Sequence, residues 1–256
     1  MPTLIRRISQ VTALLATFWL VAGCQGTGDR LEVPTPSADR FAGMTLSCLY
    51  ATSINHIVAG GWLDGKDGSV EAIIVRSWNG GKTWKRIGSE TWDQRDFIVQ
   101  NLHFNDRIRG WASGLRILET GPVATVARTE DGGGHWRESV IPESRASFVS
   151  NTRELVFVTD SVGAVEIVFE DHDTGEFLAN VYTTSDGGRN WIIDSFKEQA
   201  EDDITDPAIS FFSESQGYRL SSPNEDGVQT VEYTVTKGET WVVVASLHLQ
   251  RFSEFY

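Results

Sequence analysis

Short apolar runs separated by polar turns recur along the whole chain and predict β-strands. Four runs rich in Val, Ile, Tyr and Ala each lead into a glycine-rich turn: Ala72–Val75, Ala124–Ala127, Leu178–Tyr182 and Thr230–Tyr233. Each is preceded by another apolar run that predicts a further strand: Leu46–Ala51, Phe97–Phe104, Glu154–Thr159 and Ala208–Phe212. Beyond the N-terminal segment, no useful length of sequence has helical periodicity. The pattern predicts an all-β fold.

The strands belong to a repeat that occurs four times. A turn sequence ending in tryptophan has the copies Ser77–Trp84, Thr129–Trp136, Thr184–Trp191 and Thr234–Trp241. A second signature precedes each copy: Gly61-Trp62, Gly110-Trp111, Gly163-Ala164 and Gly217-Tyr218. We expect the second signature to begin the second strand of each unit and the tryptophan to begin the last. Each unit of about 50 residues then holds four antiparallel strands, which is the size of a propeller blade.

The turn sequence has the form Ser/Thr-x-Asp-x-Gly-x-x-Trp and resembles the Asp-box, or BNR, repeat of sialidase-like propellers. With the preceding Gly-Trp, residues 44–247 are most similar to the photosystem II stability/assembly factor family. The chain departs from that pattern at Asn79 and Thr236, which replace the box Asp, and at Ala164, and it has four repeats where that family usually has seven. The resemblance implies a β-propeller of about four blades over residues 44–256. Whether four blades close a ring stays open.

The box residues have a structural explanation. A short polar side chain accepts an amide hydrogen bond two residues on, Gly supplies positive φ, and the Trp ring packs on the neighbouring strand. We therefore predict that the box residues stabilise the outer turns and take no part in catalysis. The residues are Ser77, Asn79, Gly81, Trp84, Thr129, Asp131, Gly133, Trp136, Thr184, Asp186, Gly188, Trp191, Thr234, Gly238 and Trp241.

The N-terminal sequence is typical of a targeting segment. Arg6 and Arg7 precede the apolar run Val11–Ala22, which is too short to span a bilayer permanently, and Gly23-Cys24 follows. This junction resembles the bacterial lipobox and implies a signal peptide over residues 1–23 and acylation of Cys24. The polar segment 24–43 then tethers the fold to the envelope membrane, the outer one if the host has two. Cys48 is interpreted as a buried hydrophobe.

The net charge of the chain limits the classes of partner that it is expected to bind. The formal net charge is −13, so phosphate backbones are repelled and nucleic acid is not expected. In a four-stranded blade, the loops at one end would be strongly acidic, and the acids are densest at Glu198, Glu201, Asp202, Asp203 and Asp206. This face would steer a basic partner, hold the protein away from an anionic membrane, or only keep the protein soluble. The opposite turns carry most of the loop bases.

No catalytic constellation stands out. The five His are scattered, and neither a nucleophile elbow nor a Walker loop is present. The spacing of Asp171, Asp173 and Gly175 partly matches calcium loops, but later ligands are lacking, so a polar hairpin is the preferred interpretation. We expect no metal and no cofactor.

These observations favour a non-catalytic, lipid-anchored propeller scaffold that binds a protein partner in the envelope, in complex assembly or stability. Trp78 and Trp92 do not repeat and, with the acidic loop, are candidate contact residues. The alternative is a sialidase-like propeller that binds carbohydrate or hydrolyses glycosides, which would require two carboxylates meeting at one site.

Overall fold

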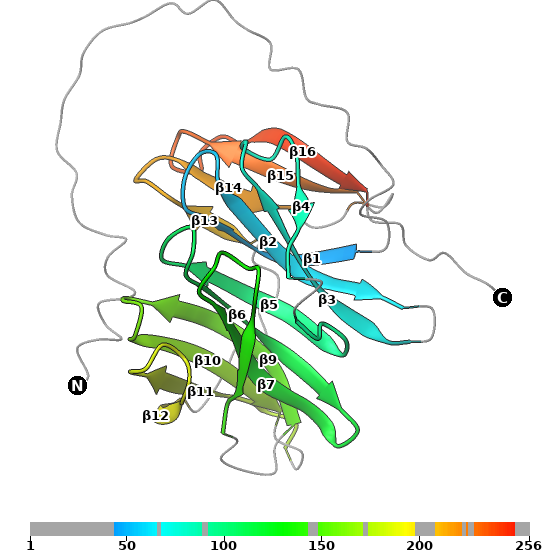
Figure 1. Ribbon diagram of the computed structural model, residues 1–256, viewed down its shortest axis with the longest axis vertical. Coiled ribbons are helices and arrows are strands. Elements are labelled where there is room, and N and C mark those ends of the chain that lie inside the picture. Colours follow the sequence, from blue (N-terminus) through cyan, green and yellow to red (C-terminus); the bar gives the residue numbers. More distant parts are fainter. Residues whose placement is uncertain are drawn as a thin grey trace, which may run out of the picture. The chain divides into compact units, whose positions relative to one another are not determined.

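The computed structural model describes residues 44–248, apart from 66–67, 89–91, 143–147, 171–173, 198–207, 222–223 and 225–227. The predicted signal peptide, Cys24 and the tether lie outside the described residues. The described part holds sixteen strands in four antiparallel sheets of four (Figure 1), so the prediction of an all-β propeller with about four blades is confirmed. None of the described residues belongs to a helix with the length and hydropathy needed to cross a membrane.

Each blade takes its strands consecutively from the chain, in the order first to fourth across the sheet. Blade 1 consists of β1 (Met44–Ala51), β2 (Ile57–Asp64), β3 (Val70–Ser77) and β4 (Lys85–Arg86). Blade 2 consists of β5 (Phe97–Phe104), β6 (Gly110–Leu118), β7 (Gly121–Thr129) and β8 (Arg137–Val140). Blade 3 consists of β9 (Phe148–Phe157), β10 (Gly163–Glu170), β11 (Phe177–Thr184) and β12 (Ile192–Lys197). Blade 4 consists of β13 (Ile209–Phe211), β14 (Gly217–Leu220), β15 (Val228–Thr234) and β16 (Val242–His248).

The first strand of blades 1 and 2 carries a bulge, and glycine makes room for it. The register shifts between Leu46 and Cys48 in β1 and between Val99 and Asn101 in β5. A Cβ atom at Gly61 would lie 1.8 Å from the carbonyl oxygen of Thr45, and a Cβ atom at Gly114 would lie 1.8 Å from that of Ile98. Only glycine fits at these two positions, because the bulged backbone occupies the space of a side chain.

Strand pairing corrects the predicted register of blade 1. Gly110, Gly163 and Gly217 begin their strands as expected, each opposite the hydroxyl residue of its box turn. In blade 1 the residue opposite Ser77 is Ile57, so Gly61 lies in the middle of β2. Gly61 is therefore the bulge glycine and no counterpart of the other three. The box tryptophans also precede the outer strands by one residue.

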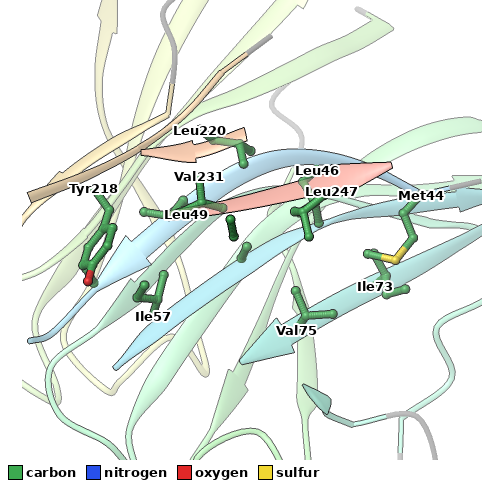
Figure 2. Close-up of a cluster of buried hydrophobic side chains, with 13 residues drawn as sticks. Met44, Leu46, Leu49, Ile57, Ile73, Val75, Tyr218, Leu220, Val231 and Leu247 are labelled. Carbon is green, nitrogen blue, oxygen red and sulfur yellow. The ribbon is translucent and has the colours of Figure 1, made fainter. Parts of the chain in front are cut away.

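Three buried apolar clusters hold neighbouring blades together. One joins blade 4 to blade 1, where Tyr218, Leu220 and Val231 pack against Leu49 and Ile57 (Figure 2). The second joins blade 1 to blade 2, and the third joins blade 2 to blade 3. Among the described residues, no such cluster joins blade 3 to blade 4. The last blade of the sequence thus packs on the first.

Each of the three clusters is accompanied by a hydrogen bond from one blade to a turn of the other. The Tyr218 hydroxyl donates to the carbonyl oxygen of Ile54 at 2.6 Å. Arg76 donates through Nη1 to the carbonyl oxygen of Gly132, in the box turn of blade 2. The indole Nε1 of Trp111 donates to the carbonyl oxygen of Gly187 at 2.9 Å, in the box turn of blade 3. Packing of the blades removes these turn carbonyl groups from water, and the bonds give each of them a hydrogen-bond partner.

Candidate functional site

One ladder position distinguishes blade 4 from the other three. It is a pair of facing residues, one in the second strand and one in the third. The residue in the third strand lies two positions before the Ser or Thr that begins the box turn. Its paired residues are Ala59 and Val75, Ala112 and Ala127, Val165 and Tyr182, and, in blade 4, Arg219 and Glu232. The first three pairs belong to the apolar clusters between blades. Blade 4 therefore places two charges where the repeat otherwise places core residues.

Arg219 and Glu232 form a hydrogen-bonded ion pair. Nε and Nη2 of Arg219 lie 2.7 and 2.6 Å from Oε2 of Glu232, and the hydroxyl of Thr230 donates to the other carboxylate oxygen at 3.0 Å. The guanidinium carbon lies 4.6 Å from the ring centroid of Trp241. The side chains of Arg219 and Glu232 are 33% and 14% exposed, so solvent reaches the pair from one side.

Apolar side chains extend the same face of blade 4. Ile209, the pairing partner of Arg219, is 47% exposed, and Phe211 is 45% exposed. The Phe211 ring lies 6.2 Å from that of Trp241. Tyr218 and Leu220, on the opposite side of β14, pack against blade 1. Blade 4 thus buries one face and presents an ion pair flanked by aromatic side chains on the other.

Blade 3 also carries an acid on a face outside the three clusters. Glu166 alternates along β10 with Val165 and Ile167, which pack against blade 2, and so points away from blade 2. It is partly buried. Ala164 and Thr183 pair on the same face of blade 3. Glu166 and Glu232 are therefore two carboxylates on faces that the apolar clusters leave uncovered.

This arrangement suits recognition of a polar, uncharged ligand. A planar guanidinium and a carboxylate held side by side present donors and acceptors to paired hydroxyl groups, while exposed aromatic rings offer an apolar surface. A half-buried ion pair is weak evidence for stability, because desolvation offsets much of the attraction between its charges.

The predicted box residues form four related turns. In blade 2, the Thr129 hydroxyl accepts from the amide of Gly133 at 2.8 Å and donates to Asp131 at 2.9 Å. Asp131 in turn accepts from the amide of His135 at 2.9 Å, four residues on and not two as expected from the sequence. Blades 1, 3 and 4 repeat this pattern with Asn79, Asp186 and Thr236 as the accepting residue.

The two box carboxylates are strongly acidic. Burial acts to raise the pKa of Asp131, but hydrogen bonds from His135 and Thr129 outweigh it and lower the pKa to about 2. Hydrogen bonds from the amide and side chain of Asn190 lower the pKa of Asp186 to about 2. Both carboxylates are therefore ionised acceptors in the turns at neutral pH, and neither is suited to deliver a proton.

The two tryptophans predicted as contact residues have different environments. Trp92 is 8% exposed, meets Phe97 edge-on and donates from Nε1 to Glu138 at 2.6 Å. Its prediction as a contact residue is corrected, because its ring fills the contact between blades 1 and 2. Trp78 is 46% exposed.

The other predicted residues are partly beyond the described chain. Glu198, Glu201, Asp202, Asp203, Asp206, Asp171 and Asp173 lie outside the described residues. Within the part that is described, no group of three or more His, Cys, Asp or Glu is placed to hold a metal ion. Cys48 is buried as predicted, and its burial raises the pKa of its thiol to about 12.

Sequence reasoning missed the significance of Arg219 and Glu232. Arg219 had no counterpart in the other repeats, and this difference was the available signal. A charged residue on a strand face where three sibling repeats carry Ala or Val indicates a changed role. Recognising this difference requires the correct alignment of the strands between repeats. The alignment of Gly61-Trp62 with the signatures of the other repeats was wrong and hid it.

No protein-family model matches the sequence, and a search of curated proteins gives no match. Several solved structures are similar to this chain. An α-L-arabinofuranosidase of glycoside hydrolase family 93 from Fusarium graminearum, in complex with arabinobiose, is 15% identical with a TM-score of 0.38, over 79% of this chain and 71% of that chain. A family 117 glycoside hydrolase of the marine bacterium Zobellia galactanivorans is 9% identical with a TM-score of 0.41, over 84% and 73%. An α-L-arabinofuranosidase of Podospora anserina, in complex with cellotriose, is 10% identical with a TM-score of 0.42, over 87% and 76%.

These comparisons correct two expectations drawn from the sequence. The expectations of a non-catalytic scaffold and of a chain that is no enzyme find no support here, since all three of these similar structures are glycoside hydrolases. A missing sequence motif does not exclude such an activity, because the carboxylates of a glycosidase meet only in the folded chain. The resemblance to the photosystem II stability/assembly factor family stays a prediction.

Proposed function

We propose that this protein is a carbohydrate-active propeller that binds a saccharide on the face of blade 4 carrying Arg219 and Glu232 and hydrolyses a glycosidic bond there. The observation that carries the proposal is the hydrogen-bonded ion pair at a ladder position that is apolar in the three sibling blades. The glycoside hydrolases of similar fold include enzymes named for arabinofuranosyl substrates, and an arabinose-containing oligosaccharide is the first ligand to test.

The chemistry assigned to each residue follows from its surroundings. Arg219 donates and Glu232 accepts, so together they can hold two neighbouring sugar hydroxyls, with Phe211 as an apolar surface for the ring. Hydrolysis requires a second carboxylate, one group protonating the leaving oxygen while the other acts at the anomeric carbon or on a water. Glu166 of blade 3 is our assignment for that second group.

The proposal is tested on the purified full chain with arabino- and cello-oligosaccharides, by calorimetric titration for binding and by reducing-sugar release for hydrolysis. Replacing Arg219 with Met should weaken binding at least about tenfold, since one charge-assisted hydrogen bond contributes roughly 1.5–3 kcal/mol. Glu232→Gln and Glu166→Gln should each abolish sugar release.

A matched ion pair in blade 1 provides the control. Arg86 and Glu71 lie 2.5 Å apart with side chains 31% and 41% exposed. Glu71→Gln breaks this pair and should leave binding and hydrolysis unchanged. Equal losses in Glu71→Gln and Glu232→Gln, or no binding and no sugar release by the wild-type protein, would contradict the proposal.

We also propose that the protein acts at the cell envelope, anchored through acylated Cys24. The support is the sequence alone: a basic start, a short apolar run and Gly23-Cys24. Mass spectrometry of the mature N-terminus should detect fatty acids on Cys24, and Cys24→Ala should release the protein from the membrane fraction. A mature protein without acyl groups would refute the anchor.

A further inference from the structure

Trp78 lies in a second cluster, far in the sequence from the blade 4 face. It follows β3 in the box turn of blade 1, and almost half of it is exposed. The imidazole of His56 stacks on the indole, with ring centroids 4.3 Å apart and planes inclined by 25°. The guanidinium carbons of Arg76 and Arg107 lie 4.6 and 5.5 Å from the indole centroid. We call these four residues the Trp78 cluster.

Two buried nitrogen atoms of the Trp78 cluster have no hydrogen-bond partner. His56 is 1% exposed, and its Nδ1 lies 2.6 Å from the hydroxyl oxygen of Thr52. Among the described atoms, His56 Nε2 and Arg76 Nε have no partner. When the Thr52 hydroxyl donates to Nδ1, both orphan nitrogens carry a hydrogen and need an acceptor. Native proteins rarely leave buried donors without acceptors, and two such atoms occur within this one cluster.

Two guanidinium groups flank the indole, and Asp131 is the carboxylate that interacts electrostatically with one of them, Arg76. Arg107 is exposed and forms no ion pair with any described residue, whereas nearby Arg109 pairs with Asp106 at 3.0 Å. Burial first, and then the charges of Arg76 and Arg107, lower the pKa of His56 to about 4. The imidazole is therefore neutral at pH 7 beside two guanidinium groups. An acidic protein thus presents a locally positive surface around an exposed indole.

We infer that the Trp78 cluster binds an oxyanion carried on a sugar ring, either a uronate carboxylate or a sulfate ester. The oxyanion would accept hydrogen bonds from the guanidinium groups of Arg76 and Arg107, and the exposed indole gives the ring an apolar surface. The saccharide part of this inference rests on the proposed function. The location does not, because the Trp78 cluster belongs to blades 1 and 2 and the Arg219–Glu232 pair to blade 4.

Calorimetric titration of the full chain with digalacturonate tests the inference. We expect binding that weakens at least about tenfold for the dimethyl ester, which keeps the ring and loses the charge. Arg107→Gln and Trp78→Leu should each lower the affinity for digalacturonate by a similar factor. Both positions are exposed at the surface, so the variants should fold.

A control variant separates this site from general electrostatics. Arg137→Gln removes another exposed arginine, on β8, and should change digalacturonate affinity less than twofold. Equal losses in Arg107→Gln and Arg137→Gln, or equal affinity for acid and ester, would each overturn the inference.

Inorganic sulfate is the remaining probe. Binding as tight as that of digalacturonate would overturn the saccharide part and leave a site for a free anion. Failure of the proposed function has a different signature. Neutral oligosaccharides would then neither bind nor be cleaved, while digalacturonate would still bind in a manner that depends on Arg107.

Discussion

The hydroxyl of Tyr218 donates a hydrogen bond to the carbonyl oxygen of Ile54 at 2.6 Å, across 164 residues of sequence. This bond joins the last blade to the first. Tyr218 is buried in the cluster between blades 4 and 1, and burial, with the neighbouring Tyr233, raises its pKa to about 12. The hydroxyl therefore keeps its proton, and remains a donor, at neutral pH.

Removing this hydroxyl tests how much the contact between blades 4 and 1 contributes. Tyr218→Phe should lower the free energy of unfolding by about 1 kcal/mol and the melting temperature by roughly 2–4 °C. The matched control is Tyr182→Phe, because the buried hydroxyl of Tyr182 has no partner among the described residues. That variant should be neutral or slightly more stable. Equal losses in thermal unfolding of the two variants would contradict a role for the bond.

The box turn of blade 4 is conformationally strained at Lys237. Its φ is 56°, in the left-handed region, where the equivalent residues Gly80, Gly132 and Gly187 have φ of 66°, 73° and 76°. Replacing Lys237 with Gly should stabilise the protein by about 1 kcal/mol, because a side chain disfavours this conformation. The urea midpoint should rise with an unchanged slope. Gly187→Ala is the reverse test and should destabilise, since its Cβ would lie 2.8 Å from the carbonyl oxygen of Asp160.

Acid unfolding should depend on the box carboxylates. The folded-state pKa of Asp186 is about 2, whereas an unfolded Asp titrates near pH 3.9. The stabilisation is therefore fully present above about pH 4 and is lost as the pH falls toward 2. Asp186→Asn should be less stable at pH 7 and lose less stability between pH 4 and 2. Asp194→Asn, an exposed acid on β12, should follow the wild-type curve in pH-dependent chemical unfolding.

His56 should make stability fall on mild acidification. Its folded-state pKa is about 4, below the value near 6.5 of an unfolded histidine. Between these two values the unfolded chain binds more protons, so the free energy of unfolding decreases as the pH falls from about 6.5 to 4. NMR titration should place the His56 transition near pH 4. His56→Gln should flatten the dependence, and an unchanged dependence in that variant would contradict the assignment.

Much of each blade was predictable because its determinants are local. The boundaries of β5 were predicted correctly, and Gly110, Gly163 and Gly217 begin strands as expected. The prediction for Gly61 was wrong because Gly61 resembles those glycines in sequence only. The residue that pairs with Ser77, and so takes the equivalent position, is Ile57. Trp78 and Trp92 looked alike as non-repeating aromatics. Only Trp92 is buried, because blade 2 supplies Phe97 and Trp136 to cover it.

The amino-acid sequence by itself determined the strands, the four box turns and the number of blades, because alternation, turn propensity and repeat length act within a few residues of the chain. Tertiary structure alone decided which blade faces become cores. Blade 4 packs on blade 1 through Tyr218 and presents Arg219 and Glu232 on its other face, and Arg107 of blade 2 approaches Trp78 of blade 1. Those contacts join residues distant along the chain, whose meeting depends on how whole sheets stack and on no local pattern.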